Sequence, residues 1–303
     1  MKLILANNQT DKFREFYKEL SEQSQIKFDY SSYSDLLFIF DSDSEQSTKV
    51  INTTTLKYLE DYDGVYINGY LNTYDTAAAV ALSCRTLGVP FVNKEFNDPV
   101  SLSKLSMNVK LNAGNVVTPY SIAGSKQAIK YAVENSMINN YPKVLKRADA
   151  DRGIDNFKVT SGEEILQLIQ DSALESIWFV QDYVDNDGYY LLTFYSGEPT
   201  FSIFRSLGVR PDGDEQKAHM YKPKGGINAT QIPIEDLPES IVIECKKSVD
   251  VMNRQIASVD CIYDEKNNKT YVLEVNYNPQ LVTIETFKDI RVQAFINNLE
   301  NIK

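Results

Sequence analysis

The order of apolar and polar residues in the first hundred positions predicts alternating strands and helices. Short apolar runs typical of buried strands are separated by longer runs whose apolar positions recur at helical spacing. The expected strands cover residues 2–6, 35–40, 64–68 and 89–92, and the expected helices cover residues 12–20, 56–61 and 74–87. Because strands that alternate with helices form parallel sheets, this region is expected to be an open α/β domain.

After residue 97 the pattern changes to runs of strands mixed with single helices. The expected elements are helices near residues 102–111, 235–254 and 283–299, strands within residues 177–184 and 189–204, and a hairpin over residues 257–277. Such a mixture is typical of an α+β region, so a domain boundary is expected near Asn97.

Charge and residue counts exclude several functional classes. With 31 Lys and Arg against 42 Asp and Glu, the net charge of −11 argues against broad affinity for nucleic acid or anionic membranes. The apolar runs are far shorter than the ~20 residues of a membrane-spanning helix, so the cytoplasm is the expected location. The single histidine, His219, excludes a multi-histidine metal site and argues against a Ser-His-Asp hydrolase. Any anionic ligand must therefore be held by local positive charge.

The hairpin near the C-terminus carries the most informative polar residues. A five-residue turn after Asp264 would place this residue opposite Thr270, and the same register places Asp260 opposite Glu274. Like charges in this position destabilise a sheet by roughly 0.2–1 kcal/mol, and Asn276 projects from the same face as Glu274. A divalent cation would resolve the conflict, and oxygen ligands suit Mg²⁺ or Mn²⁺. The alternative is a surface hairpin whose register differs by one residue.

The strand that contains Asp260, followed by YVLEVNYNP at residues 271–279, resembles the metal-binding end of the ATP-grasp superfamily. In that superfamily an acidic residue on one strand and Glu-x-Asn on the next hold Mg²⁺ ions that bridge the phosphates of ATP. The resemblance implies that Asp260, Glu274 and Asn276 are metal ligands and that the cofactors are ATP and Mg²⁺ or Mn²⁺. It also implies an ATP-grasp fold, α/β plus α+β, preceded by an open Rossmann-like α/β domain.

Other segments resemble the superfamily in the same order along the chain. PKVLK at residues 142–146 resembles the strand whose lysine reaches the phosphates, and SKL at residues 103–105 resembles a helix start that carries a second lysine. FVQDYV at residues 179–184 resembles the hinge strand whose backbone contacts adenine, with Asp185 or Asp187 near the ribose. The implied cofactor-binding residues are Lys104, Lys146, Gln181, Asp182, Tyr183, Val184 and Asp187. The implied domains are residues 1–97, a small lid subdomain over 98–184 with the lysines and hinge, and a metal-binding subdomain over 185–303.

Within the superfamily, SIFRS at residues 202–206 and KPKGGIN at residues 222–228 are most similar to RimK-type and glutathione-synthetase-like ligases. This similarity implies catalytic roles for Arg205 at the transferred phosphoryl group and for Lys224 or Asn228 at the acyl end. The implied activity is an ATP-dependent carboxylate-amine ligase that forms an amide or peptide bond through an acyl phosphate. The implied substrates are ATP, a carboxylate, and an amine on an amino acid or peptide.

Two alternatives remain open at this point. The loop after Lys146 contains only Gly153, where the superfamily usually has a glycine-rich phosphate cover, so a nucleotide-binding protein that has lost catalysis is one alternative. A non-nucleotide α/β module that binds sugars or transfers glycosyl groups is the other, if the register of Asp260 and Glu274 is wrong. The sequence also leaves open whether the protein is a homo-oligomer.

Overall fold

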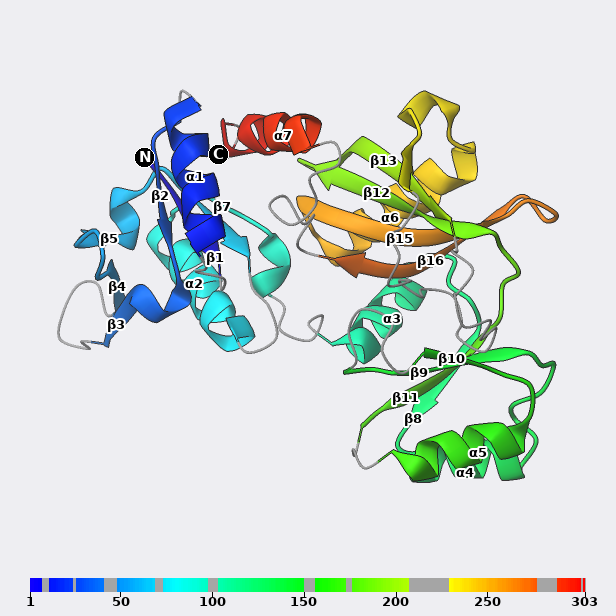
Figure 1. Cartoon of the computed structure of the whole chain (residues 1–303). Coiled ribbons are helices and arrows are strands. Elements are labelled where there is room, and N and C mark those ends of the chain that lie inside the picture. Colours follow the sequence, from blue (N-terminus) through cyan, green and yellow to red (C-terminus); the bar gives the residue numbers. More distant parts are fainter. Residues whose placement is uncertain are drawn as a thin grey trace.

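The computed structural model describes residues 1–6, 11–23, 26–40, 48–68, 73–97, 103–149, 156–172, 176–206, 229–276, 288–300 and 302. These residues form an N-terminal α/β unit, a small antiparallel sheet with two helices, and a larger antiparallel sheet between them along the molecule (Figure 1). Within the described ranges, no helix is long and apolar enough to span a membrane.

The N-terminal unit is built on a four-stranded parallel sheet, as the sequence pattern predicts, except that one strand lies at residues 28–31 and not at residues 35–40. Its strands are β1 (Lys2–Ala6), β2 (Phe28–Ser31), β6 (Gly64–Asn68) and β7 (Phe91–Val92), in the order β2-β1-β6-β7. All three pairings are parallel. The helices α1 (Asp11–Gln23) and α2 (Tyr74–Leu87) accompany this sheet.

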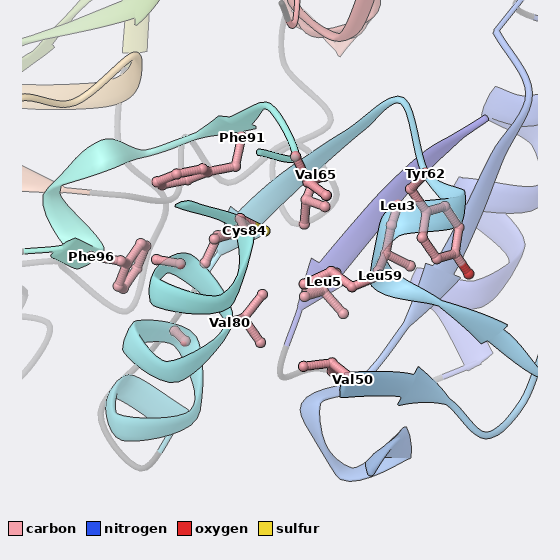
Figure 2. Packing of buried hydrophobic residues seen from close by; sticks show 14 of the residues in the cluster. Leu3, Leu5, Val50, Leu59, Tyr62, Val65, Val80, Cys84, Phe91 and Phe96 are labelled. Atoms are coloured by element: carbon pink, nitrogen blue, oxygen red, sulfur yellow. The ribbon is translucent and has the colours of Figure 1, made fainter. Parts of the chain in front are cut away.

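Alternate residues of β1 enter two different cores because side chains alternate along a strand. Leu3 and Leu5 pack with Val80 of α2 in the core shown in Figure 2. Ile4 points to the other face of the sheet and packs with residues of α1 and with Phe295 of α7 (Lys288–Glu300). The last helix therefore returns to the N-terminal unit and lies beside it in Figure 1.

Residues 35–61 differ from the sequence expectation. The apolar run near residues 35–40 forms β3 (Leu36–Phe40), but it pairs antiparallel with β4 (Thr48–Asn52) in a separate sheet that also contains β5 (Lys57–Tyr58). The helix expected at residues 56–61 is wrong, because β5 is followed only by a single 3₁₀ turn, Leu59–Asp61. Leu56 has a φ of 58°, which is incompatible with a helix, and six residues are too few to offset the cost of helix nucleation.

The small unit is an antiparallel sheet covered by helices on one face only. Its strands are β8 (Ser121–Gly124), β9 (Lys143–Arg147), β10 (Asn156–Val159) and β11 (Trp178–Asp182), in the order β10-β9-β11-β8. Leu145 and Trp178 pack against Ile129 of α4 (Lys126–Glu134) and Ile165 of α5 (Gly162–Asp171). In Figure 1 the opposite face of this sheet is directed towards α3 (Lys104–Ala113) and the large sheet.

The large unit is a five-stranded antiparallel sheet. Its strands are β12 (Gly188–Tyr195), β13 (Glu198–Ser206), β14 (Ala229–Gln231), β15 (Ile256–Asp264) and β16 (Lys269–Asn276), in the order β14-β13-β12-β15-β16. One face packs on α6 (Glu239–Met252). Met107 and Leu111 of α3 belong to this same core, so α3 packs with the large sheet rather than with the small unit assigned to residues 98–184.

Candidate nucleotide and metal site

Asp260 and Glu274 lie directly opposite each other on β15 and β16, as the sequence predicts. The expected turn is nevertheless wrong, because Asp264 pairs with Lys269 and not with Thr270. The register shifts by one residue between Asp260 and Cys261, and Leu273 is the extra residue on β16. Without this bulge, Asp260 would face Leu273. Bulges often redirect side chains at functional sites, and this one creates the carboxylate pair.

The residues around these carboxylates provide the oxygen ligands that a hard divalent cation prefers. Asp260 is buried, with 4% of its surface exposed, and the Asn276 amide Nδ2 lies 3.5 Å from its Oδ2. Two carboxylates and an amide oxygen suit Mg²⁺ or Mn²⁺ and not zinc. Among the described residues, no group of three or more His, Cys, Asp or Glu side chains is placed to hold a metal, so a cation here would need the amide and ligand oxygens.

Lys146, on β9, is coupled electrostatically to Glu274 and to a second lysine, Lys104. Lys146 lies on the helix-free face of the small sheet, opposite Phe179, and its Nζ is 5.6 Å from the ring centroid of Phe179. Burial lowers the pKa of Lys146 to about 8, while the negative charge of Glu274 raises this pKa and the positive charge of Lys104 lowers it further. Lys104, Lys146 and Glu274 therefore interact electrostatically although they come from α3, β9 and β16.

The start of α3 positions Lys104. Ser103 is the N-cap residue of the helix, and its Oγ accepts a hydrogen bond from the backbone N–H of Ser106 at 3.0 Å. One turn later, Met107 Sδ accepts the backbone N–H of Val275 at 3.5 Å, which joins the helix to β16. The first turn of α3, which carries Lys104, is thereby joined to the strand that carries Glu274.

A hydrogen-bond chain orients Lys146. Its Nζ donates to Gln181 Oε1 at 3.2 Å, and Gln181 Nε2 donates to Ser121 Oγ at 2.9 Å. Gln181 is buried, with 3% of its surface exposed. The amide can therefore hold the lysine in one direction.

The hinge residues after Gln181 point in different directions. Asp182 faces the helices of the small unit, where its Oδ1 lies 2.5 Å from Nζ of the buried Lys143. The side chain of Asp182 is therefore directed away from the Lys146 face, and only its backbone could contact a nucleotide there. Tyr183 lies under Lys158, whose Nζ is 3.9 Å from the ring centroid, and Val184 packs in a small core with Tyr189.

The acidic residues beyond the hinge lie at the surface. Asp187 is exposed, and Asp185 is exposed with Oδ2 at 3.8 Å from Nζ of Lys266. The expected ribose role of Asp187 thus stays a prediction. The expected catalytic residues Lys224 and Asn228 lie outside the described residues.

Arg205 lies on the same face of the large sheet as Asp260. It is buried, with 6% of its surface exposed, and its Nη1 donates to the hydroxyl of Tyr189 at 3.0 Å. Burial raises the pKa of Tyr189, Asp260 raises it further, and Arg205 lowers it. Arg205, Tyr189 and Asp260 are thus brought together by the strands β13, β12 and β15.

Sequence reasoning missed Lys143, Ser121, Lys158 and Tyr189, the residues that hold or flank the predicted ones. Tyr189 pairs with Arg205 only after a register shift between Thr193 and Phe194. The turn itself pairs Tyr195 with Glu198, a register that would place Arg205 opposite Gly188. The motif SIFRS indicates Arg205, but no sequence signal indicates the bulge that places Tyr189 opposite it.

Two antiparallel sheets, each packed against helices, form the part of the chain that the family comparison covers. The chain belongs to the RimK-like ATP-grasp domain family, whose model matches residues 102–299. The ATP-grasp family and fold expected from the sequence are thereby confirmed.

Several solved structures share this fold over nearly the whole chain. The D-alanine–D-alanine ligase from Bacillus anthracis complexed with ATP has a TM-score of 0.64 and 11% identity, over 100% of this chain and 97% of that one. The ATP-grasp ligase PsnB complexed with minimal precursor, Mg and ADP has a TM-score of 0.65 and 11% identity, over 98% and 97%. The RimK domain ATP-grasp protein from Sphaerobacter thermophilus has a TM-score of 0.59 and 13% identity, over 99% and 98%. No curated protein sequence matches the chain.

Proposed function

We propose that the protein is an ATP-dependent carboxylate-amine ligase, with an amino acid or peptide among its substrates. The observation that carries the proposal is the electrostatic coupling of Lys146, which Gln181 holds on β9, with Glu274 on β16 and with Lys104 on α3, because the three residues come from separate elements. Lysines and carboxylates contributed by three elements suit the binding of a nucleoside triphosphate together with a divalent cation. The fold shared with D-alanine–D-alanine ligase and PsnB supports the same reading.

The proposed nucleotide position lies between the two antiparallel sheets. Lys146 and Lys104 would bind the phosphates, Gln181 would hold Lys146 in place, and the backbone from Asp182 to Val184 would contact the adenine edge. Asp260, Glu274 and Asn276 would hold Mg²⁺ or Mn²⁺. The bound cation would neutralise phosphate charge and so favour displacement at the terminal phosphorus.

The proposed chemistry needs no protein nucleophile. A carboxylate is a poor acyl donor, but transfer of the γ-phosphoryl group to it gives an acyl phosphate with a good leaving group. An amine then attacks the acyl carbon, the amide forms and phosphate leaves. The protein contributes positioning and positive charge, with Arg205 directed at the transferred group.

The fixed position of Arg205 suits this role. Its hydrogen bond to Tyr189 holds the guanidinium on the face of the sheet that also carries Asp260. A preorganised cation stabilises developing charge without reorganising during the reaction. Lys224 and Asn228 are proposed to act at the acyl end.

The test is phosphate release from ATP and Mg²⁺, measured across a panel of amino acids and short peptides. Release that depends on both an acid and an amine, together with a new amide detected by mass spectrometry, is the expected result. ADP binding without any substrate-dependent phosphate release would instead favour a nucleotide-binding protein that has lost catalysis. Absence of metal-dependent stabilisation by ADP would contradict both.

Arg205→Ala separates catalysis from binding. The variant should have a lower single-turnover rate, while its ADP affinity should change little. The reason is that the negative charge on the transferred phosphoryl group meets Arg205 mainly in the transition state. A variant that loses only ATP affinity and keeps its maximal rate would make Arg205 a binding residue. Lys246→Met, which breaks an exposed ion pair with Glu198, is a matched control.

A further inference from the structure

A polar junction attaches the N-terminal unit to the segment that leads into β15. Asn93 Nδ2 donates to the carbonyl of Ile67 at 2.8 Å, and Asn93 Oδ1 accepts the backbone N–H of Ile256 at 3.2 Å. Gln255 Oε1 accepts the backbone N–H groups of Asn93 and Lys94, both at 2.9 Å. The junction is therefore made by specific hydrogen bonds as well as by apolar contact.

A buried ion pair lies at the centre of this junction. Glu95 belongs to the short helix Lys94–Asn97, and Arg254 directly follows the C-cap residue of α6. Arg254 Nε lies 3.3 Å from Glu95 Oε1, and the side chains are 1% and 0% exposed. Arg254 Nη1 also donates to the backbone carbonyl of Val275. One guanidinium thus contacts a carboxylate of the N-terminal unit and the backbone of β16.

Val275 is the residue between the two proposed metal ligands of β16, Glu274 and Asn276. Its N–H donates to Met107 Sδ and its carbonyl accepts from Arg254, so both of its backbone groups are bound outside the β15–β16 ladder. The bulge at Leu273 interrupts the regular ladder directly before Glu274. The position of this short stretch is therefore set by Arg254 and Met107 as well as by strand pairing.

We propose that Arg254 is a positioning residue for the metal site, and that Glu95 holds it in place. The inference rests on the proposed function, because it concerns the same metal ligands. By fixing the carbonyl of Val275, Arg254 fixes the direction of the side chains of Glu274 and Asn276. Docking of the N-terminal unit is thereby linked to the geometry of the metal ligands in another unit.

The simultaneous contacts of Arg254 with Glu95 and Val275 depend on the shape of the guanidinium group. The guanidinium presents Nε to Glu95 and Nη1 to Val275 from one rigid plane, whereas a lysine ammonium is a single point on a flexible stem. Arg254→Lys keeps a cation beside Glu95 but cannot reproduce both contacts. The double variant Glu95→Leu/Arg254→Met removes both charges together, so that neither is left buried alone.

The experiment measures Mn²⁺ binding to the protein in the presence of ADP by electron paramagnetic resonance, and ADP binding without metal by calorimetry. Thermal unfolding checks that each variant is folded. The dissociation constant for Mn²⁺ should rise ~10- to 100-fold in Arg254→Lys and in the double variant, which is the effect of outer residues that orient metal ligands. Metal-free ADP affinity should not change. Lys246 lies on α6, the helix that ends just before Arg254. The control variant Lys246→Met should bind Mn²⁺ like the unmodified protein.

Wild-type Mn²⁺ affinity in either folded Arg254 variant would overturn the proposal and leave the pair a docking contact. An equal loss of metal-free ADP affinity would also overturn it, because the defect would not be specific to the metal ligands. If the unmodified protein with ADP bound no Mn²⁺, the proposed metal site would fail, and this inference would fail with it.

Discussion

Asp260 and Glu274 face each other across β15 and β16 because Leu273 is bulged out of register. The paired carboxylates repel when no cation is present, at a cost of roughly 0.2–1 kcal/mol. Such a pair is unfavourable for the stability of the sheet alone. Glu274 is also coupled electrostatically to Lys146. A cation bound between the two carboxylates would offset their repulsion.

Glu274→Gln and Asp260→Asn should therefore separate stability from function. Each removes one charge and keeps the shape, so thermal unfolding without metal should be unchanged or shift upwards slightly. Metal-dependent turnover and Mn²⁺ binding should be lost. Full activity in both variants would refute the assigned metal site.

Asp264→Asn is the matched control on the same strand. Asp264 accepts hydrogen bonds from the backbone and side chain of Asn267 at 3.2 and 2.7 Å, and these hold the turn. This variant should lower thermal stability and leave Mn²⁺ affinity unchanged. The two effects are therefore opposite to those expected at Glu274.

The pKa of Lys146 predicts a pH dependence of nucleotide binding. Its pKa is lowered to about 8, chiefly by burial, so the ammonium that binds phosphate is progressively lost as the pH rises through 8. Binding of ADP stabilises the ammonium, so ADP affinity should fall above pH 8 and binding should take up a proton there. Calorimetry in buffers of different ionisation enthalpy measures this uptake. Lys146→Met should abolish it and weaken ADP binding by about 1.5–3 kcal/mol.

Gln181→Glu tests the same assignment from the neighbouring residue. A carboxylate in place of the amide that accepts from Lys146 Nζ would raise the pKa of this lysine. The fall in ADP affinity should then move to higher pH. An unchanged pH profile in this variant would assign the titration to another group.

The sequence indicates the residues proposed for the site but not the contacts that hold them. Motif order along the chain indicates Lys146, Gln181 and Glu274, since each belongs to a short recognisable segment. The parallel N-terminal sheet is predictable in part, because β1 and β6 are each followed by a helix, whereas β2 is followed by β3, β4 and β5 and was not expected. By contrast, the 3₁₀ turn at Leu59–Asp61 could not be told from a helix by periodicity over six residues.

The two bulges mark the limit of sequence reasoning. Counting from a turn fixes the register only if every residue in the ladder is paired, and one extra residue changes each pairing beyond it. The pairing of Asp260 with Glu274 was predicted correctly from a turn one residue too long, and the bulge at Leu273 compensates for that error. The pairing of Arg205 with Tyr189 follows the second shift and had no signal in the sequence.

Tyr189→Phe should impair the chemical step through Arg205. The change removes the hydroxyl that accepts from Arg205 Nη1 at 3.0 Å but keeps the ring that packs beside Val184. A hydrogen bond to a charged group contributes about 1.5–3 kcal/mol, so the single-turnover rate should fall roughly 10- to 100-fold. ADP affinity should be retained. Tyr190→Phe, one residue along the strand and on the opposite face, is the control; a fall in its rate of the same size would show a general defect of β12.

Gly188→Ala should disturb the same arginine through its backbone. A Cβ on Gly188 would lie 2.3 Å from the carbonyl oxygen of Arg205 and 2.6 Å from Cζ of Phe204, so β13 must move away to admit it. Overpacking of this kind costs about 1–3 kcal/mol, and here the displaced residue is the proposed catalytic arginine. We expect a lower single-turnover rate together with lower thermal stability.

Gly197→Ala in the turn of the same hairpin is the matched control, because φ is +77° there and no atom lies within 4 Å of the added Cβ. It should lower stability by about 1–2 kcal/mol through backbone strain and leave the rate unchanged. If both variants lose stability and neither loses rate, Gly188 serves only the packing of the hairpin, and the position of Arg205 does not limit the reaction.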